Sequence, residues 1–163
     1  MSAQLFVVAT PIGHLDDMTY RAVQVLEFVS LIAAEDTRQS APLLKHYNIT
    51  TPLTAVHDHN EKQKIDEIIK KLQNGENVAL ISDAGTPLIS DPGFRLVRAA
   101  QQANIRVTPI PGACAAIAAL SSVGLPSDRF LFVGFLPSKA SQRQGQLEQL
   151  KNHSETLILY EAP

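Results

Sequence analysis

Four short segments of the sequence combine glycine, proline and polar side chains in a way that could hold a ligand. They are residues 10–13, 35–38, 83–87 and 109–113. Each segment directly follows an apolar run that is typical of a buried strand. In open α/β sheets, ligands bind at the carboxyl ends of the strands. The shared placement therefore predicts a ligand site at that edge of a sheet, more firmly than any one segment does.

The most unusual stretch is residues 82–93. It contains two glycines, two prolines and two aspartates, without an apolar period. A turn needs only a few such residues, so the length of this stretch favours a binding loop. Residues 10–13 taken alone are more typical of a turn, because Gly and Pro after a strand usually have that role.

Residues 113–122 are predicted to form a helix that consists almost wholly of small side chains. Small residues let a helix pack closely on a sheet. They also let an anion, such as a carboxylate, approach the free N–H groups at the helix start. Both interpretations stay open. Cys114 is interpreted as a packing or pocket-lining residue, because no basic partner that would activate it as a nucleophile is near in sequence.

Residues 57–61 are a polar cluster ahead of another predicted helix. Asn60 suits the N-cap, with Gln63 in a capping-box position, so a solvated, capped loop explains the cluster as well as a site does. His57 and His59 do not make a zinc site without further ligands, and no metal is predicted. Glu35 is placed like the ribose-binding acid of a dinucleotide fold, but residues 10–13 lack the required glycine pattern.

The elements that would position these segments alternate in type. Strands are predicted at residues 5–9, 31–34, 53–56, 77–82 and 105–110, and helical periodicity fills the intervals between them. Asp91 and Pro92 suit the N-cap and first position of the helix that follows the long loop. Strands that alternate with helices predict the α/β class, with a five-stranded parallel sheet flanked by helices.

A second unit is predicted beyond this sheet. We expect a first α/β domain at residues 1–122 and the beginning of a second α/β domain at residues 123–163. The second would contain strands 130–135 and 156–160, joined by a helix at 141–152. Two strands and one helix do not close a stable layer, so this domain is expected to be incomplete.

Composition limits the classes of function. The chain has 163 residues, 45% hydrophobic and 18% charged, which is globular and excludes a disordered tail or a coiled coil. The net charge is −2, whereas a protein that binds nucleic acid by bulk charge would be basic, so any RNA contact must be local. A single cysteine, no leader and no apolar run long enough for a membrane span predict a soluble, cytoplasmic protein.

The ligand segments resemble those of bacterial 16S rRNA cytidine 2′-O-methyltransferases, which belong to the tetrapyrrole methylase-like (class III) methyltransferases. The resemblance is carried by residues 8–17, 34–38, 57–61, 82–93, 111–113 and 134–137, and it covers essentially the whole chain. It implies that S-adenosylmethionine (SAM) binds in a cleft between two α/β domains, and that the protein is commonly a homodimer. Family members are much longer, so we expect a truncated chain.

The resemblance also implies which residues contact the cofactor. They are Pro11, Asp83, Ala84, Gly85, Thr86, Pro87, Ala113, Cys114, Ala115 and Tyr160. Thr86 stands where relatives in the wider family have Asp, and Asp83 is the candidate substitute for that acidic contact. Glu161 is an alternative to Tyr160.

The implied reaction transfers a methyl group to a cytidine ribose 2′-hydroxyl of 16S rRNA in the small ribosomal subunit. A general base would help to remove the hydroxyl proton, and the ranked candidates are Asp36, Glu161 and Asp91. The candidate RNA contacts are Arg21, Arg38, His57, His59 and Asn60. Arg129, Lys139, Arg143 and Lys151 add a basic region in the second unit.

Two other functions compete with this one. A methyltransferase for a tetrapyrrole precursor would share the cofactor loops but would need an apolar pocket for a macrocycle. Residues 35–38 and 57–61 favour the rRNA type. The second competitor is a truncated, non-catalytic fragment that binds a ligand or mediates dimerisation.

Overall fold

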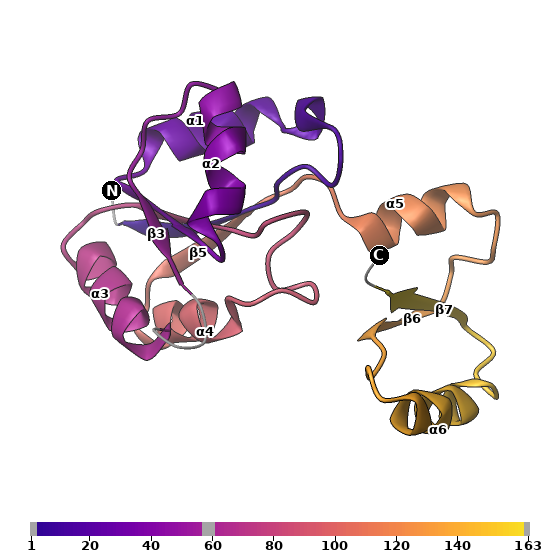
Figure 1. Cartoon of the computed structure of the whole chain (residues 1–163). Helices are drawn as coiled ribbons and strands as arrows, with labels where there is room; N and C mark the ends of the chain where they lie inside the picture. The colour runs from indigo at the N-terminus through magenta and orange to yellow at the C-terminus, as the bar shows by residue number, and fades with distance from the viewer. Residues whose placement is uncertain (1–2, 57–60, 162–163) are drawn as a thin grey trace. The chain divides into compact units, whose positions relative to one another are not determined.

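A computed structural model describes residues 3–56 and 61–161 (Figure 1). The chain divides into two compact units, Met1–Cys114 and Ala115–Pro163. The elements of the first unit are β1 (Gln4–Val8), the short 3-10 helix η1 (Leu15–Asp17), α1 (Tyr20–Phe28), β2 (Leu31–Ala34), α2 (Thr37–His46), β3 (Leu53–Ala55), α3 (Glu61–Gln73), β4 (Val78–Ile81), α4 (Phe94–Gln102) and β5 (Arg106–Ile110).

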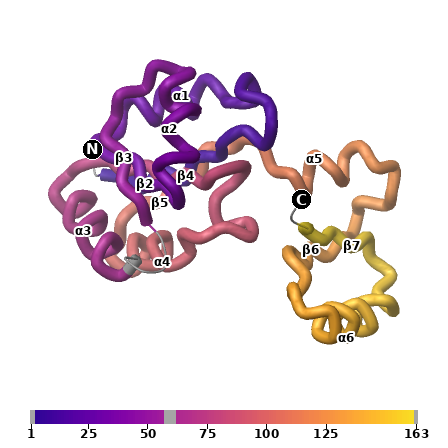
Figure 2. Tube along the Cα trace, viewed as in Figure 1, coloured from indigo at the N-terminus to yellow at the C-terminus, as the bar shows by residue number. Residues whose placement is uncertain are grey.

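The first unit is built on one five-stranded sheet. Its strand order is β3-β2-β4-β1-β5, and every neighbouring pair is parallel. All four residues of β4 are buried, as expected for a central strand covered on both faces. The predicted α/β class and five-stranded parallel sheet are confirmed. The tube view shows these strands gathered between the helices (Figure 2).

The helices cover both faces of this sheet. The connections from β1 to β2 and from β2 to β3 run in one direction across the strand order, and the next two run in the other. Right-handed crossovers then put α1 and α2 on one face and α3 and α4 on the other, as Figure 1 shows. Each face has its own apolar core, around Leu26 and Ile32 on one side and around Ile68 and Leu96 on the other.

The start of α4 differs from the prediction. The N-cap is Gly93, with φ of 118°, and the helix begins at Phe94 instead of at Pro92. Asp91 does not cap the helix, because it lies two residues before the N-cap, where its side chain is half-buried. A β-carbon on residue 93 would lie 2.8 Å from Leu80 Cδ2, so the close approach to β4 also requires glycine there.

The second unit contains α5 (Ala115–Ser122), β6 (Phe130–Phe135), α6 (Ala140–Leu150) and β7 (Thr156–Tyr160). β6 and β7 form a parallel pair with an irregularity between Phe132 and Gly134, and α6 connects them. The compact units meet after Cys114, so α5 groups with the second unit, although the predicted first domain runs to Ser122. Compact units need not coincide with domains, and the domain bounds stay a prediction.

No helix within residues 3–56 and 61–161 combines the length and apolar character that crossing a bilayer requires.

Candidate functional site at the carboxyl edge of the sheet

The loops that follow β1, β2, β4 and β5 all begin at the carboxyl edge of the sheet. β4 lies between β1 and β2, and its loop leads to the opposite face from the loops of both neighbours. Chains that leave adjacent strands toward opposite faces open a crevice between them, which is where α/β sheets bind ligands. The topology therefore brings together the four segments that the sequence singles out.

Backbone hydrogen bonds join the β1 loop to the β4 loop. Thr10 N–H donates to Gly85 O at 2.9 Å, and Gly85 N–H donates to Thr10 O at 3.1 Å. This is an antiparallel bridge beyond an otherwise parallel sheet. The buried Thr10 hydroxyl also donates to Ser82 O at 3.1 Å. These bonds fix residues 82–85 against the end of β1.

The β4 and β5 loops are also joined. The Thr86 hydroxyl donates to Ala113 O at 3.0 Å. A β-carbon on Gly112 would lie 2.9 Å from the Ala9 β-carbon, so the β5 loop passes close to the end of β1 because residue 112 is glycine. Three of the four loops thus hold one another through direct contacts.

The β2 loop reaches the same edge through Asp36. Its backbone N–H donates to Asp83 Oδ1 at 3.3 Å. The Asp36 side chain caps α2 by accepting from Arg38 N–H at 2.8 Å, and its Oδ2 lies 2.7 Å from Arg38 Nη2. These hydrogen bonds from the Arg38 side chain and backbone lower the pKa of Asp36 to about 2. Asp36 is consequently a weak proton acceptor.

Asp91 has the opposite electrostatic environment. Burial raises the pKa of its carboxyl group, and the nearby negative charge of Asp83 adds to the rise. Ser82 lowers this pKa, but by less than the other two effects raise it. No Lys or Arg among the described residues forms an ion pair with Asp83 or Asp91. The β4 loop therefore holds two carboxylates near each other, and in the part of the chain that the structure describes neither is paired with a Lys or Arg.

The other predicted cofactor residues of the first unit lie in these loops. Pro11, Gly85 and Pro87 are buried, Asp83, Thr86, Ala113 and Cys114 are half-buried, and Ala84 is exposed. The structure thus gathers the first-unit residues at one edge. Thr10, Ser82 and Gly112 also build this edge but are not among the predicted site residues. A polar residue directly after a buried apolar run is the signal that could have identified the first two.

Ala115, Tyr160 and Glu161 belong to the second unit. The Tyr160 hydroxyl accepts a hydrogen bond from Ala116 N–H at 3.1 Å, at the start of α5. The Tyr160 ring packs edge-on against Phe132 and Phe135. One N–H group that was expected to be free for an anion is therefore bonded to a phenol. Glu161 Oε1 lies 4.0 Å from Arg143 Nη1.

The predicted RNA contacts are dispersed. Arg21 and Arg38 are exposed near the starts of α1 and α2, whereas His57, His59 and Asn60 lie outside the described residues. In the second unit, Lys151 pairs with Glu148 and Arg143 faces Glu161, so two of the four predicted basic residues are already near acids. Within residues 3–56 and 61–161, no group of three or more His, Cys, Asp or Glu side chains is arranged to hold a metal ion.

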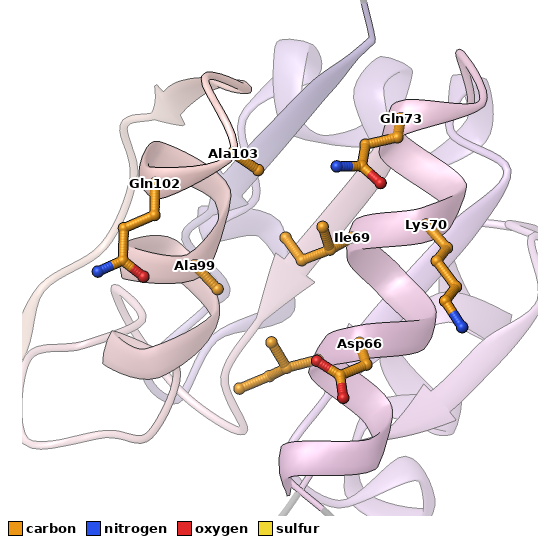
Figure 3. Close-up of a pocket in the computed structure, with 8 residues that line it drawn as sticks. Asp66, Ile69, Lys70, Gln73, Ala99, Gln102 and Ala103 are labelled. Atoms are coloured by element: carbon orange, nitrogen blue, oxygen red, sulfur yellow. The ribbon is translucent and has the colours of Figure 1, made fainter.

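A further hollow of about 450 Å³ lies between α3 and α4, on one face of the sheet. Figure 3 shows Ile69, Ala99 and Ala103 around the gap between the helices, and Gln73 reaches from α3 toward α4. The sequence indicates each helix separately, but it does not indicate that the two helices lie side by side.

Sequence comparison finds close relatives with one name. The chain is 62% identical over 159 residues to Ribosomal RNA small subunit methyltransferase I of Pseudomonas aeruginosa, covering 98% of this chain and 56% of the relative. It is 57% identical over 159 residues to the protein of the same name from Escherichia coli O157:H7, again covering 98% and 56%. The chain thus spans a little over half the length of these relatives. The resemblance inferred from the loops is confirmed.

Solved structures share the fold at low identity. A diphthine synthase aligns with a TM-score of 0.70 at 14% identity, covering 99% of this chain and 66% of that one. A uroporphyrin-III-C-methyltransferase from Thermus thermophilus aligns with a TM-score of 0.61 at 22% identity, covering 83% and 61%. The sequence model of one family, Tetrapyrrole (Corrin/Porphyrin) Methylases, matches residues 4–163. Because that match spans nearly the whole chain, the chain belongs to the Tetrapyrrole (Corrin/Porphyrin) Methylases.

Proposed function

We propose that this chain provides the cofactor-binding part of a SAM-dependent methyltransferase, and that the enzyme methylates a cytidine ribose 2′-hydroxyl in 16S rRNA of the small ribosomal subunit. The observation that carries the proposal is the 62% identity over 159 residues to a relative named for small-subunit rRNA methylation. The four joined loops at the carboxyl edge support it, because they supply a ligand edge at the expected place.

The charge of the β4 loop fits the cofactor. SAM carries positive charge on its sulfonium and on its amino group. Asp83 and Asp91 place negative charge near each other without a basic partner among the described residues, and a cation would relieve their repulsion. Asp83 therefore suits the acidic role that Thr86 lacks. The loops at the same edge of the sheet also supply buried or half-buried surface, from Pro11, Gly85, Pro87 and Ala113.

When bound, SAM supplies an electrophilic methyl group. The protein's residues would then align the ribose hydroxyl, exclude water and accept its proton. Among the three candidate bases, we favour Asp91 over Asp36. The raised pKa of Asp91 makes it the stronger proton acceptor, whereas the pKa of Asp36 is held at about 2 by Arg38. Glu161 stays a candidate in the second unit.

Several predictions about partners accompany this proposal. Arg38 is the preferred phosphate contact near the loops, since its guanidinium is exposed at the start of α2. His57, His59 and Asn60 remain predicted RNA contacts, as do a homodimer and a cytoplasmic location. Tyr160, Ala115 and Cys114 remain predicted cofactor contacts.

A tetrapyrrole-precursor methyltransferase is the less favoured alternative. Relatives at 54–62% identity are named for rRNA, whereas the uroporphyrin methyltransferase structure is only 22% identical and indicates the fold alone.

The test is calorimetry with SAM, followed by methyl transfer by the full-length protein to small ribosomal subunits and, separately, to a tetrapyrrole acceptor. We expect binding and transfer to the ribosomal subunits only. Thr86→Arg should abolish SAM binding, because it places a long cation between the β4 and β5 loops. Thr50→Arg, at an exposed position before β3, is the control and should bind normally. Transfer to neither acceptor would refute the enzymatic proposal, and unchanged affinity of Thr86→Arg would refute the placement.

A further inference from the structure

We propose that one exposed side of α4 is a track for a single-stranded stretch of rRNA beside the target nucleotide. The track, called the α4 stripe below, consists of Phe94, Arg98 and Gln102. It rests on the function proposed above and adds the surface that would hold the RNA. The three residues are four positions apart, so their side chains lie along one side of the helix.

Phe94 supplies an aromatic surface next to the cofactor loops. It is the first residue of α4, directly after residues 82–93, and its side chain is 62% exposed. Its backbone is held in place, because Gly93 has a φ of 118° and packs closely against Leu80. The backbone thus fixes where the ring starts, and the ring belongs to neither apolar core. Exposed aromatic rings are the surfaces on which unstacked RNA bases stack.

Arg98 and Gln102 continue the stripe with groups that suit a nucleic acid. Arg98 is exposed and its guanidinium makes no hydrogen bond or ion pair with the described residues, so it is available to a phosphate. Gln102 is exposed and offers an amide to a base edge. Phe94 and Gln102 are about 12 Å apart along the helix axis, the length of about three stacked nucleotides.

The hollow between α3 and α4 borders the far end of the α4 stripe, because Gln102 also lines it. Its volume is about 450 Å³, and Ile69, Ala99 and Ala103 give it an apolar floor. Figure 3 shows Gln73 pointing into this space from the opposite helix, whereas the ammonium of Lys70 points away from α4. An apolar floor with an amide at its rim suits an unstacked base better than it suits an acidic peptide.

The test measures RNA affinity directly in the full-length protein. The ligands are unmethylated small ribosomal subunits and a short single-stranded RNA of the surrounding rRNA sequence. We expect Phe94→Ala to weaken RNA binding about tenfold, within the range measured for loss of one stacked base. Phe94→Tyr keeps an aromatic ring and should restore binding. Arg98→Ala should reduce the slope of log affinity against log salt by about one.

Matched controls come from outside the stripe. Phe28→Ala removes a phenylalanine that is 67% exposed at the end of α1, on the other face of the sheet. Arg106→Ala removes an exposed arginine at the start of β5. Both controls should bind RNA normally. If Phe94→Ala and Arg98→Ala bind RNA as these controls do, the proposal is wrong.

Two further outcomes would also overturn the proposal. One is that Phe94→Tyr binds RNA as weakly as Phe94→Ala, which would exclude stacking. The other is that Phe94→Ala loses SAM affinity in parallel with RNA affinity, which would assign the ring to the cofactor loop. The proposed function fails separately, when the unsubstituted protein transfers no methyl group to small subunits.

Discussion

The pKa values of two aspartates at the same edge of the sheet are shifted in opposite directions. The Asp36 side chain is only partly exposed, and its charge is stabilised by Arg38, which lowers its pKa to about 2. No Lys or Arg among the described residues forms an ion pair with Asp91, and burial raises its pKa. Environments that separate the pKa values of neighbouring carboxyl groups are typical of sites where the groups have different roles. One of these residues is suited to a permanent charge and the other to proton transfer.

Arg38→Ala should raise the pKa of Asp36 from about 2 toward its ordinary value of 3.8. The rise should be partial, because the bond from the backbone N–H of residue 38 survives the substitution. The paired carboxylate stabilises the fold above pH 3.8, and this stabilisation is lost as the pH falls toward 2. NMR titration of the carboxyl carbons measures the shift. Lys64→Ala is the control, since it should raise the pKa of Glu67 and leave Asp36 unchanged.

Asp91→Asn should make the protein more stable at neutral pH and leave its stability near pH 3 almost unchanged. Because the pKa of Asp91 is raised by folding, the folded state holds this proton more tightly than the unfolded state does. The carboxylate therefore destabilises the fold increasingly as the pH rises above its unfolded pKa. Urea unfolding at two pH values measures the difference. A loss of stability at neutral pH would contradict the assigned environment.

The methyl-transfer rate should provide a second readout of Asp91. If Asp91 is the base, the rate rises with pH as its carboxyl group ionises, and Asp91→Asn removes that rise along with most of the activity. Asp36→Asn should leave the position of the rise unchanged, because Asp36 is ionised throughout the same range. A rise that persists in Asp91→Asn would exclude Asp91 as the base.

At the scale of the elements, the local sequence pattern was sufficient to predict the bounds of three strands. β2, β6 and β7 begin and end at their predicted residues, since each is a short apolar run bounded by polar residues or turns. The start of α4 could not be predicted, because Asp91-Pro92 is a good local start signal, whereas the helix begins after Gly93, whose close approach to Leu80 depends on tertiary structure. The order of the strands in the sheet could not be predicted from the local sequence pattern either. No residue of β4 indicates that β1 and β2 are its neighbours.

Gly93→Ala should destabilise the first unit by about 2–5 kcal/mol. Alanine pays about 1–2 kcal/mol for a left-handed backbone, and contact with Leu80 adds about 1–3 kcal/mol. Gly75→Ala is the matched control, because Gly75 has φ of 91° but no atom near its missing β-carbon. It should cost only the backbone part, about 1–2 kcal/mol. Denaturant unfolding measures both variants, and equal losses would show that the Leu80 contact has no effect.

At the scale of the whole molecule, the two units have very different cores. The first unit has an apolar cluster on each face of its sheet. In the described part of the second unit, the buried hydrophobic side chains are Ala116 and Leu150. A two-stranded sheet with so little buried apolar surface is at most marginally stable. The composition of the chain as a whole conceals this contrast.

Residues 1–114 should therefore fold when produced alone, and residues 115–163 should not. Far-ultraviolet circular dichroism with thermal unfolding measures each fragment. We expect a cooperative transition for the first fragment and a gradual, non-cooperative change for the second. A sharp transition in residues 115–163 would contradict this assignment.

Part of the candidate site was predictable, because the architecture of the whole sheet decides where its loops lie. The carboxyl ends of parallel strands share one edge, so Pro11, Asp83 and Ala113 could be grouped without knowing which strands are neighbours. The contacts between the loops could not be anticipated. They depend on which strand ends lie beside each other, as the close approach of Gly112 to Ala9 illustrates.

The backbone bridge between Thr10 and Gly85 determines when these loops lose their conformational freedom. Ordering one residue costs about 1–2 kcal/mol in entropy, and here that cost falls on folding instead of on ligand capture. A ligand that arrives at this edge meets loops whose shape is already set. Little of its binding free energy is then lost to ordering the loops, and its affinity depends mainly on its contacts. The bridge thus links the stability of the sheet to the affinity of the site.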